Sequence, residues 1–200
     1  MTLTIFDTPV LHPLMRRLSA VVLRLLGWRV EGRLPASPKF VLIGAPHTSN
    51  WDLPLTLLAA FTLDAKIYWL GKQSIFRPPF RRLFQWLGGL PIDRDRAGGV
   101  VAQCVAYFRQ NEQLILTVAP AGTRKRVLRW KTGFYRIAVA AGVPVAMGFM
   151  DYRRKSGGIG PVLHPTRDLS ADMAVIRGFY QTVTGKHPHQ SVSGEESSGM

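Results

Sequence analysis

Cysteine is almost absent from this chain of 200 residues, since Cys104 is the only one. A single cysteine excludes an intrachain disulfide, and nothing in the sequence demands an oxidising compartment. Because Cys104 lies in an apolar helical stretch, we expect it to pack in the core. No apolar run approaches the ~20 residues that a membrane span needs. The N-terminus also lacks the basic region, apolar block and cleavage site of a signal peptide, so we expect the protein on the cytoplasmic side.

Acidic residues are also scarce. Twelve Asp and Glu stand against 26 Lys and Arg, which gives a net charge of +14. Hydrophobic residues make up 46% of the chain, which is typical of a globular protein and too high for a disordered one. A chain of this length is sufficient for one domain with a substantial core.

The positive charge is concentrated in the middle third of the chain. Residues 72–136 contain 13 basic side chains and only three acidic ones, a net charge of +10. Such a segment attracts phosphate groups on a small substrate, on an anionic membrane or on nucleic acid. The alternative is a solvated basic surface that only aids solubility. The basic residues are Lys72, Arg77, Arg81, Arg82, Arg94, Arg96, Arg109, Arg124, Lys125, Arg126, Arg129, Lys131 and Arg136.

Strand-like and helix-like segments alternate along the sequence. This order predicts a single α/β domain with a mostly parallel or mixed sheet flanked by helices. We divide the chain into an N-terminal amphipathic helix (1–30), the main domain (31–184) and a polar, disordered tail (185–200). The predicted strands are 39–44, 66–70, 114–119 and 143–150, and the predicted helices of the main domain are 53–63, 100–110, 133–141 and 171–184.

The first helix, predicted over 11–28, has apolar residues at helical spacing and three arginines, Arg16, Arg17 and Arg24, among its polar positions. A helix of this kind can lie in a membrane interface. It can equally well pack its apolar face on the domain with the arginines in water. The sequence leaves both possibilities open.

A histidine and an aspartate, separated by four residues, occupy the polar turn after the first predicted strand. His47 and Asp52 thus lie at a strand-to-helix junction, where side chains are held at the mouth of a sheet. A neutral imidazole there can take a proton from an alcohol, while a carboxylate on its other nitrogen fixes the tautomer. The alternative is a histidine that only caps or fills the core.

Three further blocks follow in order. The second runs from Gly71-Lys72 through the basic and aromatic residues 76–80 to Gly88-Gly89-Leu90-Pro91-Ile92-Asp93-Arg94. The third is Pro120 followed by Gly122-Thr123-Arg124, and the fourth is Val143-Pro144-Val145. With the H-x4-D pair, these blocks closely resemble those of the glycerolipid acyltransferase family, which includes 1-acylglycerol-3-phosphate acyltransferases. The resemblance covers residues 44–146, about half of the chain.

The resemblance implies an O-acyltransferase fold and activity. A fatty acyl group would pass from acyl-CoA or acyl carrier protein to the hydroxyl of a lysophospholipid, with His47 as base and Asp52 holding it. Arg94 and Arg124 would bind the acceptor's phosphate, since guanidinium is always charged and grips phosphate with two hydrogen bonds. Gly122 would let the backbone approach closely, and Thr123 would bond phosphate or the developing oxyanion. The alternatives are a surface ion pair for Arg94 and a solvated turn for Arg124.

Lys72, Arg77, Arg81 and Arg82 alternate with aromatic residues. They would line the approach of a lipid acceptor or touch anionic headgroups, or they would form an ordinary basic face over a packed aromatic core. Neither arrangement requires a metal or a resident cofactor, because no cluster of Cys, His and acidic residues has ligand spacing.

The third block departs from the family's pattern at one position. Ala121 stands where the family has glutamate, and a methyl group can neither carry charge nor accept a hydrogen bond. The change is either a deliberate replacement or a natural divergence, and in both cases we expect this chain to be less active than an Ala121→Glu form. A non-catalytic lysolipid-binding relative is therefore an alternative. A nucleic-acid binder fits the charge, but no nucleic-acid motif with defined spacing is present. As an acyltransferase, the protein is expected at the inner face of the membrane, in contact with anionic lipid.

Overall fold

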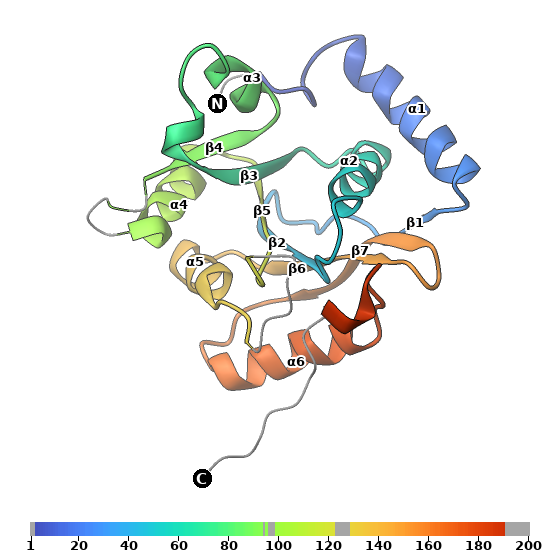
Figure 1. Ribbon diagram of the computed structural model, residues 1–200. Coiled ribbons are helices and arrows are strands. Elements are labelled where there is room, and N and C mark those ends of the chain that lie inside the picture. The colour runs from blue at the N-terminus through green and yellow to red at the C-terminus, as the bar shows by residue number, and fades with distance from the viewer. Residues whose placement is uncertain (1–2, 94, 96–98, 123–128, 191–200) are drawn as a thin grey trace.

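A central sheet of seven strands, flanked by helices on both faces, forms the molecule (Figure 1). The computed structural model describes residues 3–93, 95, 99–122 and 129–190. The strands are β1 (Arg29–Glu31), β2 (Lys39–Ala45), β3 (Ile67–Lys72), β4 (Gly89–Ile92), β5 (Leu114–Val118), β6 (Val145–Asp151) and β7 (Ser156–Leu163). The helices are α1 (Leu11–Leu25), α2 (Asp52–Thr62), α3 (Arg81–Trp86), α4 (Gly99–Gln110), α5 (Gly133–Ala141) and α6 (Leu169–Gln181), with short 3-10 turns at Gln73–Ile75 and Pro188–Gln190.

The strand order is β1-β7-β6-β2-β5-β3-β4. Strands β6 and β7 pair antiparallel, and the other neighbouring pairs are parallel. The predicted single α/β domain with a mostly parallel, mixed sheet is therefore confirmed. Because β2, β3, β4, β5 and β6 all run in one direction, the segments that follow them emerge at one edge of the sheet.

Alternating side chains of β2 build the core on both faces of the sheet. Val41 and Ile43 belong to the cluster that includes residues of α4, α5 and α6, whereas Phe40 and Leu42 pack with Phe61 of α2. This alternation follows from the two-residue period of a strand, and it explains why the apolar run at 39–44 is buried on both sides. Cys104 is fully buried in α4, as predicted.

Strands β1, β4 and β7 were not among the predicted strands, and residues 185–190 also differ from the sequence-based expectation. Strand β7 was not predicted, because its glycines and proline (Ser-Gly-Gly-Ile-Gly-Pro-Val-Leu) are unfavourable in strands. A Cβ on Gly160 would overlap the ring of Phe179, so the glycine lets α6 approach the sheet closely. Residues 185–190, predicted as the start of a disordered tail, are instead packed against the turn that contains His47: the His187 N–H donates to Thr48 Oγ1 at 3.2 Å. Residues 191–200 lie outside the described part of the chain.

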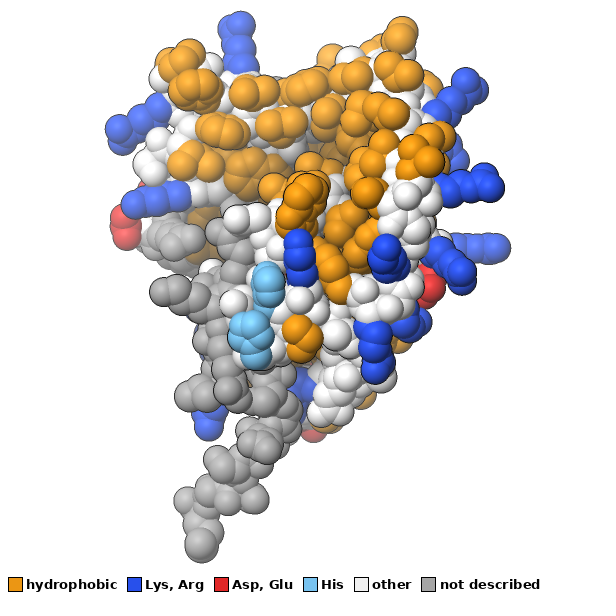
Figure 2. Space-filling model, turned by 45° about the vertical axis from the view of Figure 1, so that its right-hand side comes forward, with side chains coloured by type: hydrophobic (Ala, Val, Ile, Leu, Met, Phe, Trp, Pro, Cys, Tyr) orange, Lys and Arg blue, Asp and Glu red, His pale blue; other side chains and the backbone are white. Residues whose placement is uncertain are grey.

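Helix α1 lies on the outer side of α2 and leaves most of its apolar face uncovered. Only Ser19 and Leu23 are fully buried. Figure 2 shows a broad apolar area on the face that carries α1, with Lys and Arg around its margin. The exposed apolar side chains of α1 and the residue after it are Leu14, Leu18, Val21, Leu25 and Leu26. The domain therefore covers one side of the helix, with Leu23 buried and Met15 and Val22 partly buried, and it leaves this second group of apolar side chains exposed. Within the described residues, no helix has the length and apolar character of a membrane span.

Candidate active site

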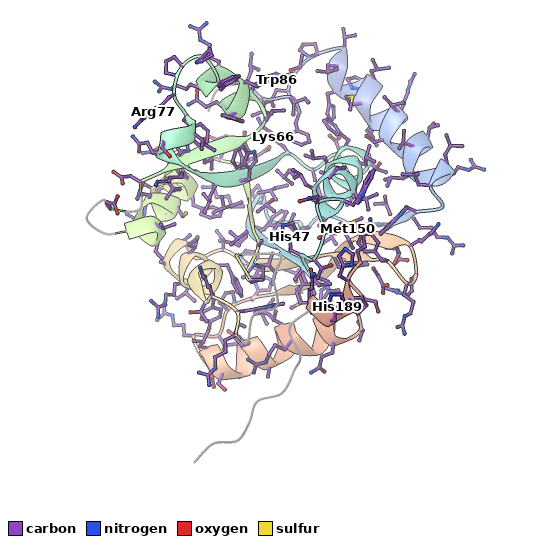
Figure 3. The ribbon with its side chains drawn as sticks, in the orientation of Figure 1. His47, Lys66, Arg77, Trp86, Met150 and His189 are labelled. Carbon is purple, nitrogen blue, oxygen red and sulfur yellow. The ribbon has the colours of Figure 1, made fainter. Side chains whose placement is uncertain are left out.

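The H-x4-D turn joins β2 to α2 and brings its two key side chains into contact. His47 Nδ1 lies 3.1 Å from Asp52 Oδ2. About a third of the His47 side chain is exposed (32%), whereas Asp52, the first residue of α2, is 4% exposed. With Nδ1 directed at the carboxylate, Nε2 is the nitrogen that can take a proton from a substrate. His47 lies near the centre of the molecule in Figure 3.

The backbone of the turn also holds the carboxylate. The N–H groups of Thr48 and Ser49 each donate to Asp52 Oδ2 at 2.8 Å. Burial alone would raise the pKa of Asp52, but the hydrogen bonds from His47, Ser49, Tyr152 and Thr48 outweigh it and hold the pKa below its ordinary value. Asp52 is therefore ionised at neutral pH and can stabilise an imidazolium on His47.

The first three sequence blocks follow the carboxyl ends of neighbouring strands. His47 follows β2, Ala121 and Gly122 follow β5, and Lys72 ends β3. Lys72 pairs with Ile92 of β4, two positions before Arg94 in the sequence. The strand order thus brings these blocks to one edge of the sheet. The fourth block has a different place, because Val143 and Val145 are buried at the amino end of β6 and serve the core.

The residues of the third block are only partly described. Gly122 has a φ of 66°, a left-handed conformation that favours glycine, and its N–H donates to Ala119 O at 3.0 Å. Ala121 is partly buried in the same turn. Three predicted substrate-binding residues, Arg94, Thr123 and Arg124, lie outside the described residues, so their roles remain predictions.

The second block separates into a packed and an exposed part. Phe76 is buried and stacks on Trp69, with ring centroids 6.0 Å apart, and Phe84 meets both rings edge-on. Phe80 is 57% exposed. The basic side chains Lys72, Arg77, Arg81 and Arg82 are all exposed. Phe76 and Phe84 therefore belong to a packed aromatic core, while the cations lie on the surface around them.

Three contributors to the site were missed from the sequence. Tyr152, which follows β6, donates its hydroxyl to Asp52 Oδ1 at 2.7 Å. The side chain of Lys131 lies beside Gly122, and the backbone N–H of Lys131 donates to Pro120 O at 3.0 Å. The segment 185–190 packs on the turn. A tyrosine 100 residues from Asp52 has no local signal, but Lys131 belongs to the basic segment and was available as a candidate.

A hollow of about 570 Å³ lies beside the turn, lined by Thr48, Ser49, Asn50, Trp51, Lys186, His187 and Gln190. Lys186 Nζ lies 5.3 Å from the centre of the Trp51 ring. The hollow is thus bordered on one side by the turn that carries His47 and on the other by the segment that carries Lys186.

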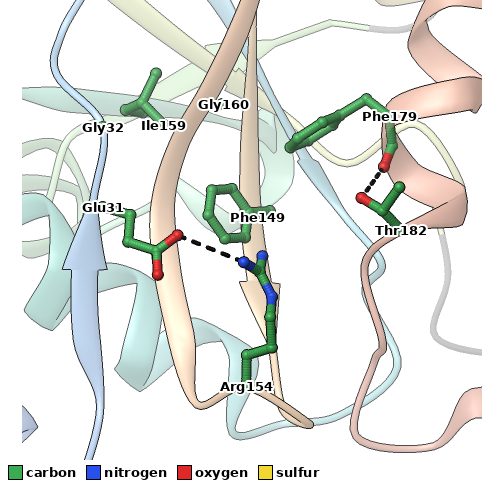
Figure 4. A pocket seen from close by; sticks show the side chains of 8 residues that line it. All are labelled: Glu31, Gly32, Phe149, Arg154, Ile159, Gly160, Phe179 and Thr182. Atoms are coloured by element: carbon green, nitrogen blue, oxygen red, sulfur yellow. Dashed lines mark hydrogen bonds and ion pairs between the residues drawn. The ribbon is translucent and has the colours of Figure 1, made fainter.

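A second hollow of about 500 Å³ contains none of the predicted site residues (Figure 4). Arg154 lines it, but its guanidinium is paired with Asp151 Oδ2 at 2.8 Å and with Glu31 Oε2 at 3.8 Å. This cation is therefore largely neutralised by its neighbours. Among the described side chains, no group of three or more His, Cys, Asp and Glu is arranged to hold a metal ion.

Comparison with known proteins places the chain in a family. The family described as Acyltransferase matches residues 28–147, more than half of the chain. The chain belongs to the acyltransferase family. The chain is 33% identical over 131 residues to the 1-acyl-sn-glycerol-3-phosphate acyltransferase of Escherichia coli, and the match covers 60% of this chain and 52% of that protein. It is 29% identical over 132 residues to the protein of the same name from Haemophilus influenzae, with 60% and 53% covered. The chain thus spans about half the length of these curated relatives.

A solved structure has the same fold as this chain. The crystal structure of the 1-acyl-sn-glycerophosphate (LPA) acyltransferase from Thermotoga maritima matches with a TM-score of 0.59 at 19% identity. The match covers 86% of this chain and 76% of that chain. The predicted family and the predicted fold are both confirmed.

Proposed function

We propose that the protein transfers a fatty acyl group from a thioester to the hydroxyl of a lysophospholipid such as 1-acylglycerol-3-phosphate. The observation that carries this proposal is the contact of His47 Nδ1 with the buried Asp52 carboxylate at 3.1 Å, with the imidazole itself partly exposed. The relatives from Escherichia coli and Haemophilus influenzae and the Thermotoga maritima protein are named for acylation of 1-acyl-sn-glycerol-3-phosphate, which supports the acceptor class.

The proposed reaction follows from the proton that His47 can accept and return. As the acceptor hydroxyl attacks the thioester carbonyl, its proton passes to His47 Nε2, and the Asp52 carboxylate stabilises the resulting imidazolium. Collapse of the tetrahedral intermediate breaks the carbon–sulfur bond, and the imidazolium returns the proton to the leaving thiolate. No acyl-enzyme forms, so initial-rate kinetics are expected to be sequential.

The acceptor's phosphate would be bound by the cations that follow β3, β4 and β5. We assign this role to Arg94, Arg124 and Lys72, with Gly122 and Thr123 presenting the backbone and a hydroxyl to phosphate or oxyanion. Phosphate binding at a fixed distance from His47 would convert the hydroxyl's attack into an effectively intramolecular step. The donor is acyl-CoA or acyl carrier protein, because a basic surface suits the phosphates of the first and the acidic surface of the second.

The acceptor lies in a membrane, and we place the protein peripherally on its anionic inner face. The exposed leucines of α1 and the basic margin around them support this placement, because such a helix buries its apolar side at the lipid interface while cations meet anionic headgroups. Trp51 and Leu53, next to the pair, are 58% and 61% exposed, so exposed apolar residues also lie beside the proposed active site.

Ala121 supports a second candidate, a non-catalytic lysolipid-binding relative. Such a protein would retain the phosphate site and the apolar surface, and it would bind lysolipid without turnover even after glutamate is restored at position 121.

The test is mass-spectrometric detection of product from lysophosphatidate with palmitoyl-CoA or with palmitoyl-acyl carrier protein. Monoacylglycerol, which lacks the phosphate, is the matched acceptor control. We expect diacylated product from lysophosphatidate and at least about tenfold less from monoacylglycerol, since a charged hydrogen-bonded contact is lost. Lysolipid binding without product from this chain and its Ala121→Glu form would favour the non-catalytic candidate.

A further inference from the structure

The two oxygens of the Asp52 carboxylate have different partners. Oδ2 faces His47 and two backbone N–H groups, whereas Oδ1 accepts a hydrogen bond from the Tyr152 hydroxyl at 2.7 Å. Asp52 is 4% exposed, so water has little access to its oxygens. Without Tyr152, Oδ1 would be a buried oxygen that has lost its hydrogen bond, a costly state for a charged group.

Tyr152 is itself fixed from several directions. It directly follows β6, which pairs with β2, the strand that leads into the turn. Its ring meets the ring of Trp28 edge-on, with ring centroids 5.0 Å apart, and its backbone N–H donates to Thr184 O at 2.9 Å. The hydroxyl therefore reaches Asp52 from a side chain that the core and the C-terminal segment hold in place.

We propose that Tyr152 is the positioning residue of the His47–Asp52 pair: by binding Oδ1, it turns Oδ2 toward His47 Nδ1. This role rests on the proposed function of His47 as a general base. In an aspartate–histidine pair, the orientation of the carboxylate selects the imidazole tautomer, and the wrong tautomer leaves no lone pair on Nε2 to take the substrate's proton.

The charge states suit this role. Burial, and then the bond to Asp52, raise the pKa of Tyr152 well above its ordinary value, so the hydroxyl remains a donor through neutral pH. Among the described side chains, His47 and Tyr152 are the titratable groups in contact with Asp52. Lys186 and His187 lie further out, against Trp51 and Thr48. Removing the Tyr152 hydroxyl takes away a donor that stabilises the ionised Asp52 carboxylate. The carboxylate then attracts a proton more strongly, so the coupled pair takes up its proton at higher pH.

The chain offers a matched control for a tyrosine-to-phenylalanine change. The Tyr135 hydroxyl also donates to a buried aspartate at 2.7 Å, Asp172 Oδ2, in a contact between α5 and α6. Tyr152→Phe is expected to lower kcat about tenfold or more, with little change in the acceptor KM, and to move the acid limb of kcat/KM to higher pH. Tyr135→Phe is expected to lower Tm but to leave kcat and the pH profile unchanged.

A readout that needs no turnover separates this inference from the proposed reaction. Nitrogen-15 NMR of the imidazole, assigned with His47→Gln, reports which ring nitrogen carries the proton. We expect the Nδ1–H tautomer in the parent and in Tyr135→Phe, and a mixture of tautomers in Tyr152→Phe. If this pattern is seen but no protein transfers an acyl group, the positioning role of Tyr152 is supported and only the proposed reaction is contradicted. If Tyr152→Phe lowers Tm while the nitrogen signals of His47 and kcat are unchanged, Tyr152 contributes only to stability and the inference is overturned.

Discussion

At the residue scale, the H-x4-D spacing is informative because both ends of the motif fall in one tight turn. The sequence was sufficient to predict that His47 and Asp52 lie together at a strand-to-helix junction, and the 3.1 Å contact agrees with that prediction. Their catalytic role remains a prediction. Tyr152 could not be predicted, because its contact with Asp52 depends on β6 lying beside β2 in the sheet, a property of the fold rather than of local sequence.

Position 121 provides the first prediction at this scale. Ala121→Glu is expected to raise the rate of acyl transfer about tenfold or more, since a carboxylate in the turn can orient nearby cations such as Lys131 through charged hydrogen bonds. The comparison is made by initial rates, with Ala121→Gln as the control of equal size without charge. Equal rates for all three proteins would contradict the importance of this position.

Asp52 also links stability to pH. Because its pKa in the folded protein is below the ordinary value of 3.8, its ionised form stabilises the fold above that pH, and this contribution is lost as the pH falls through the lower folded value. The parent is therefore expected to exceed Asp52→Asn in free energy of unfolding near neutrality, and the gap should narrow below about pH 4. Denaturant unfolding at several pH values measures it. A gap that stays constant on acidification would show that the charge of Asp52 contributes nothing.

At the element scale, segments with a regular apolar period were predicted well. Helix 133–141 has the predicted bounds, because apolar residues recur at helical spacing and a glycine follows it. Strand β7 was missed because its glycines are explained only by what packs on them: Met150 on Gly157, the backbone of Glu31 on Gly158, and Phe179 of α6 on Gly160. The segment 185–190 was missed because its polar composition resembles that of a free tail.

The contact between this segment and the active-site turn yields a prediction. A Cβ on Gly185 would lie 2.9 Å from Thr48 Oγ1 and 3.0 Å from Pro46 Cγ. Gly185→Ala is therefore expected to displace the turn, lowering both Tm and kcat. Gly178→Ala in α6 is the control, because no atom lies within 4 Å of its added Cβ, and it should stabilise the protein by about 0.5–1 kcal/mol. If the two variants behave alike, the packing of 185–190 on the turn is unimportant.

At the scale of the whole molecule, charge and apolar surface are arranged together. The net charge of +14 is difficult to explain by solubility alone when cations border an exposed apolar face and the blocks that we propose to bind phosphate follow neighbouring strands. The sequence showed that α1 is amphipathic but left its partner open. The structure narrows this choice, because the domain covers one side of the helix and leaves Leu14, Leu18, Val21 and Leu25 exposed.

Vesicle flotation tests the membrane role of that face. Replacing Leu14 and Leu18 of α1 with glutamate is expected to weaken binding to anionic vesicles about tenfold or more. Two leucines that would enter the lipid interface are lost, and two negative charges are added. Val175→Glu on α6 is the control, because Val175 is 56% exposed and Leu14 is 57% exposed. Unchanged flotation of the α1 variant would place the membrane contact elsewhere.

The most direct test of the central claim is the rate of acyl transfer to lysophosphatidate by the parent and by His47→Ala, measured in the Ala121→Glu background and scored by mass spectrometry of the diacylated product. A general base contributes a factor of about 100 or more, so the loss of His47 is expected to lower kcat by at least that factor while the protein stays folded. A folded His47→Ala protein that retains its rate to within about twofold would contradict general-base catalysis by His47.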